Sequence, residues 1–235
     1  MTKIKYLKVQ FTDSIQPWEI PAFRGAIVEK VGRTHDWFHN HRTESTYFYR
    51  YPKIQYKCAG NHPMLLCLHE GVEEIHKLFE QPDWSLHLRK RNLDMRIHRL
   101  DLHEFNIHLM DTPQRYRIYN WVALNEKNYQ EYQQLDALTE RITFLEQKLA
   151  AHIISFAKSI EWHIHERFEV KIVHLSPARW VKIKGVRMMA FDITFDTTVF
   201  IPDYLGLGRK VSVGYGTVKR QLQKAKQPVF TPVLD

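Results

Sequence analysis

The chain has few cysteines and no long apolar run, the features of disulfide-rich secreted proteins, cysteine-based zinc sites and membrane-spanning proteins. Only two of its 235 residues are cysteine, Cys58 and Cys67, which is too few for a disulfide framework or a cysteine-based zinc site. We expect both thiols to be reduced, in a cytoplasmic protein. No apolar run approaches the roughly 20 residues that cross a bilayer, and the N-terminus lacks the apolar stretch of a signal peptide. The sequence therefore predicts a protein with no membrane partner.

Acidic residues are also scarce relative to basic ones. There are 34 Lys and Arg against 26 Asp and Glu, which gives a formal net charge of +8. Residues 171–235 hold 11 basic and 4 acidic side chains, whereas residues 125–170 hold 5 and 8. A basic C-terminal third favours a polyanionic partner, of which nucleic acid is the commonest, although a basic soluble protein needs no such partner.

The first half of the chain alternates between strand and helix patterns. Period-two alternation and aromatic-rich runs predict strands at residues 4–12, 46–58 and 64–68, and alternating stretches at residues 95–110 and 115–124 complete the pattern. A helical period predicts one helix over residues 17–33 and a second that begins at Gly71. The resulting order, β-α-β-β-α-β, is the ferredoxin-like plan that RNA-recognition modules share.

The second half begins with a long helical pattern. Apolar residues recur at steps of three and four from Tyr132 to Ile160, and no proline or glycine interrupts residues 126–165. We therefore predict one long amphipathic helix, whose apolar face either packs within the chain or binds a second copy in a homodimer. Strand-like pieces follow at residues 168–175, 179–184 and 188–195. The fold class is α+β, with domains at residues 1–124 and 125–235.

Four of the nine glycines lie within eleven residues. They are Gly206, Gly208, Gly214 and Gly216, and the loop between them carries Arg209, Lys210 and Ser212. Glycine permits positive φ angles and close approach of the backbone, so amides beside cations indicate a phosphate-binding loop. The spacing fits neither a Walker loop nor a dinucleotide fingerprint. We favour RNA contact, and the alternative is a connector that packs two domains together.

Two lysines precede this loop on a basic strand. Lys182 and Lys184 share one face by the period of two. They either contact phosphate beside the glycine loop or form a solvated charged surface.

These features together resemble a known family. The paired glycines follow a strand that ends Thr-Val-Phe-Ile-Pro, a combination similar to the RAMP superfamily. Two further stretches, Phe-His-Asn-His at residues 38–41 and Tyr-Arg-Tyr-Pro-Lys-Ile-Gln-Tyr-Lys at residues 49–57, resemble the CRISPR-associated endoribonucleases that cut precursor CRISPR RNA at its repeats. The resemblance implies two tandem ferredoxin-like (RRM-like) domains. It also implies cleavage without metal or cofactor that leaves a 2′,3′-cyclic phosphate.

Two histidines occupy the stretch in which the resemblance implies a catalytic histidine. Cutting RNA with its own 2′-OH needs a base for that proton and an acid for the leaving 5′-oxygen, and an imidazole can serve as either. Each such proton transfer contributes roughly 10²–10⁴-fold. We therefore name His39 and His41 as catalytic, without assigning base and acid. Tyr49 and Lys30 are candidate helpers that position the 2′-OH or stabilise the charged phosphorane.

Other histidine and aromatic patterns have competing explanations. His163 and His165 form a second His-x-His pair at the end of the predicted long helix, where a cation suits the helix dipole. Neither pair has a third zinc ligand at convincing spacing, so we predict no metal site. Tyr47, Tyr49 and Tyr51 alternate onto one strand face, where they either stack bases or pack in the core.

The sequence thus predicts a metal-independent endoribonuclease of CRISPR RNA maturation, with repeat RNA as its partner. The first alternative is a non-cleaving RNA-binding subunit of a CRISPR effector complex, and the second is an RNA-binding protein unconnected to repeats. The retained histidines favour the enzyme.

Overall fold

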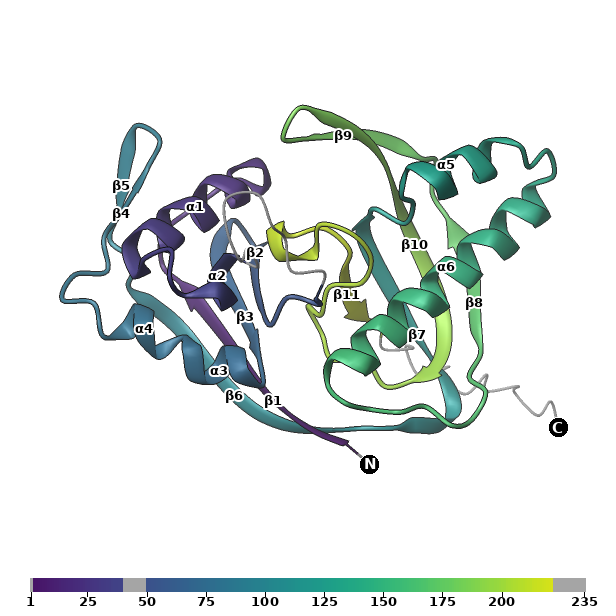
Figure 1. The fold of residues 1–235 in the computed structure, drawn as a ribbon, viewed down its shortest axis with the longest axis horizontal. Coiled ribbons are helices and arrows are strands. Elements are labelled where there is room, and N and C mark those ends of the chain that lie inside the picture. The colour runs from purple at the N-terminus through teal and green to yellow at the C-terminus, as the bar shows by residue number, and fades with distance from the viewer. Residues whose placement is uncertain (1, 40–49, 222–235) are drawn as a thin grey trace, which may run out of the picture.

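The computed structural model describes residues 2–39 and 50–221, which form a four-stranded and a five-stranded sheet with helices packed against them, and a small sheet of two strands (Figure 1). The first sheet has the order β2-β3-β1-β6, with each neighbouring pair antiparallel. This is the strand order of a ferredoxin-like domain, so the predicted plan of the first half is confirmed. Its strands are β1 (Thr2–Phe11), β2 (Ile54–Ala59), β3 (His62–Leu68) and β6 (Ile97–Ile107).

Helices cover one face of the first sheet because alternate strand residues are apolar. Val9, Phe11 and Leu65 from the strands share a buried cluster with Phe23 and Ile27 from α1. The short elements on this side are η1 (Pro17–Glu19), α1 (Ile20–Val31), α2 (Asp36–His39), α3 (Glu70–Glu74), α4 (His76–Phe79), β4 (Leu86–Leu88) and β5 (Arg91–Leu93). Helix α1 ends at Gly32, whose φ of 95° favours glycine.

The second sheet repeats the order of the first. Its path is β11-β7-β10-β8, and β9 pairs with β10 outside this path. Helix α6 buries Leu145, Leu149, Ile153 and Phe156 in the core beneath the sheet, so the long amphipathic helix packs within the chain. The elements are β7 (Leu109–Trp121), α5 (Glu126–Gln133), α6 (Leu138–Ser159), β8 (Val170–Leu175), β9 (Arg179–Ile183), β10 (Val186–Val199), η2 (Val211–Val213) and β11 (Thr217–Arg220).

The predicted single helix over residues 126–165 is wrong in its extent, because two helices replace it. Asn125 begins α5 by accepting a hydrogen bond from the Asn128 N–H at 2.7 Å. The chain then leaves helical geometry, and the Glu140 carboxylate accepts from the Ala137 N–H at 3.3 Å as α6 begins. A glutamate three residues after the cap is the usual start signal of a new helix.

The change from the first sheet to the second comes at His108, between β6 and β7. The strand expected at residues 115–124 overlaps β7, which ends at Trp121 and pairs with β10 and β11, whereas the sequence prediction placed the boundary after Leu124. Apolar and polar residues alternate in both β6 and β7, so only the strands with which they pair show which sheet each belongs to. The expected strand at 46–58 begins at Ile54, and residues 40–49 are outside the described part of the chain.

The two cysteines lie on the hairpin of β2 and β3 but are not opposite each other. Cys67 is paired with Ile54 across β2 and β3, and Cys58 with Pro63. Both are free thiols. Among the described residues, no helix combines the length and apolar character needed to cross a membrane.

The two larger sheets share one buried cluster. Tyr6 and Leu68 from the first sheet belong to the same buried cluster as Trp121 and Leu145 from the second half. Lys53 of the first half donates to the Ser159 carbonyl at the end of α6, where a cation is favourable to the helix dipole. Segments from both halves are therefore held in a defined relation where they meet.

Candidate functional site

The glycine-rich loop lies where the two halves meet. Its glycines allow close packing: a Cβ at Gly216 would stand 1.8 Å from the Leu207 carbonyl oxygen, and one at Gly208 would stand 2.8 Å from the Trp121 ring. The Gly216 N–H donates to the Asn120 carbonyl at 3.1 Å, and the Arg209 N–H to the Val122 carbonyl at 3.0 Å. Gly208 and Gly216 pack within the second half, whereas a Cβ at Gly206 would stand 2.8 Å from the Gln55 side-chain oxygen of the first domain, so packing between domains, the alternative interpretation, accounts for Gly206. The backbone of the loop also holds the neighbouring side chains in place.

A buried glutamine fixes this loop to the first domain. The Gln55 side-chain oxygen accepts from the Gly206 N–H at 3.0 Å, and its amide nitrogen donates to the Tyr51 hydroxyl at 3.0 Å. The Tyr51 hydroxyl in turn donates to the Gly206 carbonyl at 2.6 Å, which closes a ring of hydrogen bonds. Tyr51 also packs on Phe156, with ring centroids 5.5 Å apart. Tyr51 is thus engaged between the domains, and Tyr47 and Tyr49 lie outside the described residues.

Four cations gather beside this loop, and we call them the basic cluster: Arg24, Lys184, Arg209 and Lys210. Partial burial lowers the pKa of Lys210, and the nearby charges of Arg209, Lys184 and Arg24 lower it further. These residues come from α1, from the turn between β9 and β10, and from the glycine loop. Mutual repulsion among them is relieved when an anion binds, so the cluster is suited to phosphate.

Arg24 connects the basic cluster to the predicted catalytic histidine. Its guanidinium donates to the Ser212 hydroxyl of the glycine loop at 3.5 Å. It also donates to the carbonyls of Phe38, at 3.5 Å, and of His39. One side chain on α1 therefore holds the end of α2 beside the loop.

His39 lies at the last position of α2. Its Nε2 is 2.8 Å from the Arg33 carbonyl oxygen. A carbonyl can only accept, so in the neutral ring Nε2 carries the proton and Nδ1 the lone pair.

Of the other three predicted catalytic residues, the structure describes only Lys30. His41 and Tyr49 fall within residues 40–49, which the structure does not describe. Lys30 donates to Asp83, to the carboxylate and to the backbone carbonyl, each at 3.0 Å. Lys30 is six residues along α1 from Arg24, so it projects from another side of that helix.

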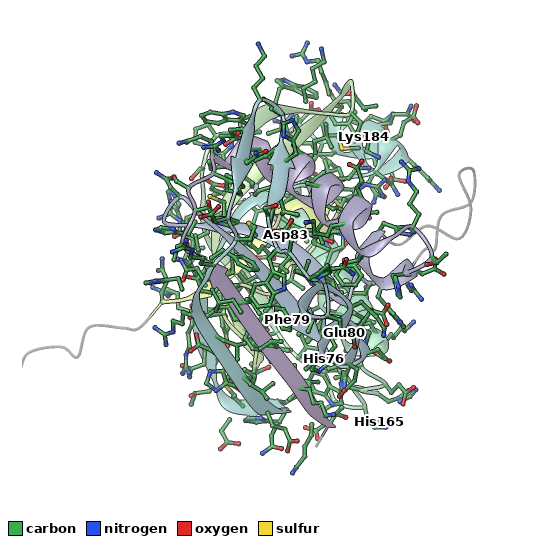
Figure 2. All side chains as sticks on the ribbon, turned by 90° about the vertical axis from the view of Figure 1, so that its left-hand side faces the viewer. His76, Phe79, Glu80, Asp83, His165 and Lys184 are labelled. Atoms are coloured by element: carbon green, nitrogen blue, oxygen red, sulfur yellow. The ribbon has the colours of Figure 1, made fainter. Side chains whose placement is uncertain are left out.

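The two predicted strand lysines are both exposed on the β9–β10 hairpin. Lys184 joins the basic cluster at the turn, where it has a φ of 49°. Lys182 lies opposite Arg187 in the pairing of the two strands. Figure 2 shows Lys184 near one end of the molecule and His165, of the second His-x-His pair, near the other.

The sequence did not reveal Arg24, Gln55 or Lys57 as residues of the site. The Lys57 side chain is on β2 with 2% of the residue exposed, and its Nζ donates to the Thr217 hydroxyl at 3.2 Å. Burial lowers the pKa of Lys57 to about 7. The only local signal for it was a polar residue within a strand pattern. Within residues 2–39 and 50–221, no three His, Cys, Asp or Glu side chains converge where they could hold a metal ion.

Comparison with known proteins identifies the family to which the chain is similar. The family models for the Cas6b N-terminal and C-terminal domains match residues 2–106 and 108–221. A solved structure titled as Cas6b has a TM-score of 0.85 and 27% identity, over 93% of this chain and 100% of that one. A second, titled as the CRISPR RNA processing endoribonuclease Cas6b, has a TM-score of 0.72 and 25% identity over the same shares.

A more remote solved structure shares the fold, and one further relative matches part of the chain in sequence. Csf5, titled as a type IV Cas6 crRNA endonuclease, has a TM-score of 0.55 at 12% identity, covering 94% of this chain and 100% of that one. An uncharacterized protein of Methanocaldococcus jannaschii is 39% identical over 100 residues, which are 43% of this chain and 67% of that protein. The resemblance to CRISPR-associated RAMP proteins is thus confirmed. Because the two domain models together span almost all of the described residues, the protein belongs to the Cas6b family.

Proposed function

We propose that the protein is a metal-independent endoribonuclease that cuts CRISPR repeat RNA and leaves a 2′,3′-cyclic phosphate. The observation that supports the proposal is the Arg24 side chain, which donates both to the His39 carbonyl and to Ser212 of the glycine loop. Membership of the Cas6b family supports the same activity, since one relative is titled a CRISPR RNA processing endoribonuclease.

The proposed chemistry needs only proton transfer and charge stabilisation. The base removes the 2′-OH proton, the 2′-oxygen attacks the adjacent phosphorus, and the bond to the 5′-oxygen breaks as the acid protonates that oxygen. His39 suits the base, because its bond to the Arg33 carbonyl leaves the lone pair on Nδ1. His41 would then be the acid. The roles of Tyr49 and Lys30, positioning the 2′-OH or stabilising the charged phosphorane, stay predictions.

The basic cluster would hold the RNA backbone next to these histidines. Lys184, Arg209 and Lys210 supply charge for the phosphates on both sides of the cut. The ordered glycine loop presents the last two of these, and Ser212 adds a hydroxyl on the same loop. Repeat RNA is thus the proposed partner, while a homodimer, assembly with an effector complex and a cytoplasmic location stay predictions.

The test is cleavage of end-labelled repeat RNA from the CRISPR array of the source genome in excess EDTA. We expect one cut, abolished by a 2′-deoxy nucleotide before the cut site and by His39→Ala or His41→Ala, with RNA affinity little changed. His165→Ala is the matched control, since it removes a histidine of the other His-x-His pair and should cut normally. Cutting that requires added metal would refute the mechanism, and tight binding without a cut would favour the RNA-binding subunit.

A further inference from the structure

Helix α2, which ends at His39, is too short to be stable by itself. It has four residues, whereas isolated helices shorter than about 12–15 residues are marginal in water. The last carbonyls of any helix also lack hydrogen-bond partners within that helix. The orientation of the His39 peptide therefore depends on donors that come from other elements.

One of these donors is a buried tyrosine of β2. The Tyr56 hydroxyl donates to the Phe38 carbonyl at 3.1 Å, and Phe38 is the residue before His39. This carbonyl lies in the same peptide plane as the His39 N–H, so the bond fixes the direction in which the chain enters His39. Figure 1 shows α2 beside β2, in agreement with this contact.

The Tyr56 side chain is itself held firmly. The residue has no exposed surface, and its ring meets the Phe23 ring of α1 edge-on, with centroids 5.7 Å apart at 83°. Burial raises the pKa of Tyr56, so the hydroxyl keeps its proton at neutral pH and stays a donor. A side chain locked by packing on a strand is a precise support for a neighbouring group.

The opposite face of β2 holds the glycine loop. Gln55 precedes Tyr56, so its side chain points to the other side of the strand, where it accepts from the Gly206 N–H at 3.0 Å. Strand β2 thus contacts the histidine segment by one face and the glycine loop by the other. Because the two side chains are consecutive on one rigid strand, they fix the spacing between these parts of the proposed site.

We infer that Tyr56 is a positioning residue for cleavage, whose hydroxyl holds the peptide between Phe38 and His39 so that the imidazole faces the RNA. This inference rests on the proposed function. Tyr56 is fully buried, so it acts through His39 and not on the RNA itself. The Arg24 guanidinium contacts the same Phe38 carbonyl at 3.5 Å, so the Tyr56 hydroxyl is the closer of these two donors.

The first test compares two variants that each lose one buried hydroxyl. Tyr56→Phe should lower the single-turnover rate of repeat-RNA cleavage at saturating protein by about 10- to 100-fold, because a misplacement of about 1 Å costs about 100-fold. RNA affinity should be little changed. Tyr116→Phe is the matched control, since Tyr116 is also fully buried and its hydroxyl accepts from the Ile201 N–H at 3.2 Å in the second half. An unchanged rate in Tyr56→Phe, or an equal fall in both variants, would overturn the inference.

The second test observes His39 directly and needs no cleavage. Nitrogen NMR of histidine-labelled protein distinguishes a proton on Nε2 from one on Nδ1, and the spectrum of His39→Ala identifies the His39 signals. The neutral ring should carry its proton on Nε2 in the wild type and in Tyr116→Phe, because Nε2 bonds the Arg33 carbonyl. Tyr56→Phe should show a mixture of the two forms.

The two tests separate the inference from the proposed function. A wild-type His39 signal in Tyr56→Phe would overturn the positioning role. Wild-type protein that never cuts repeat RNA, while Tyr56→Phe alone changes the His39 signal, would refute the proposed function and support the positioning of His39 by Tyr56.

Discussion

Lys57 should make the stability of the protein depend on pH in the alkaline range. The amine is buried at the contact between β2 and β11, where the Thr217 hydroxyl accepts one of its three protons. Burial lowers its pKa from 10.5 to about 7. The unfolded chain therefore binds more protons than the folded chain between these two values, so stability rises with pH across this window.

The magnitude follows from the difference in pKa. At pH 7 the folded amine is half protonated, and keeping it buried costs about 4 kcal/mol relative to an amine exposed in the unfolded chain. Lys57→Met removes this cost and gives up one hydrogen bond worth about 1 kcal/mol. The variant should therefore be more stable at pH 7 by about 3 kcal/mol. Its advantage should shrink by up to about 1.4 kcal/mol per pH unit.

The assay is urea unfolding of the wild type and Lys57→Met at pH 7, 8, 9 and 10. The difference between the two curves isolates Lys57, because every other titrating group is present in both proteins. Lys127→Met is the matched control, since Lys127 is exposed on α5 and its replacement should give parallel curves. A constant difference between wild type and Lys57→Met over this range would refute the reasoning.

Two further predictions concern the second half of the chain. Gly216→Ala should abolish folding or lower the melting temperature strongly, because its Cβ would stand 1.8 Å from the Leu207 carbonyl oxygen. Gly25→Ala is the control, since a Cβ there meets nothing within 4 Å. Equal melting temperatures of the two variants would contradict the packing at Gly216. Burial lowers the pKa of His152 to about 4, so the unfolded chain gains a proton that the folded chain does not as the pH falls below 6.5. Between pH 7 and pH 5 the wild type should lose about 2 kcal/mol more unfolding free energy than His152→Gln, and equal losses by urea unfolding would refute this.

The sequence by itself determined features that depend on local periodicity. Alternation predicted the strands β1, β2 and β3, and a helical period predicted α1, since these signals act over a few residues. The same local information predicted the helix that packs under the second sheet. It also identified the glycine loop and the histidine segment by composition and by resemblance.

Only the tertiary structure decided which strands pair across long distances. The alternating patterns of β6 and β7 are alike, and Phe105 lies opposite Ile4 while Tyr116 lies opposite Phe195. The site depends on the same kind of contact, since Arg24 meets Ser212, which lies far along the chain. Single polar residues such as Gln55 have no periodicity to reveal them. Their roles arise from the packing of two domains that no local pattern encodes.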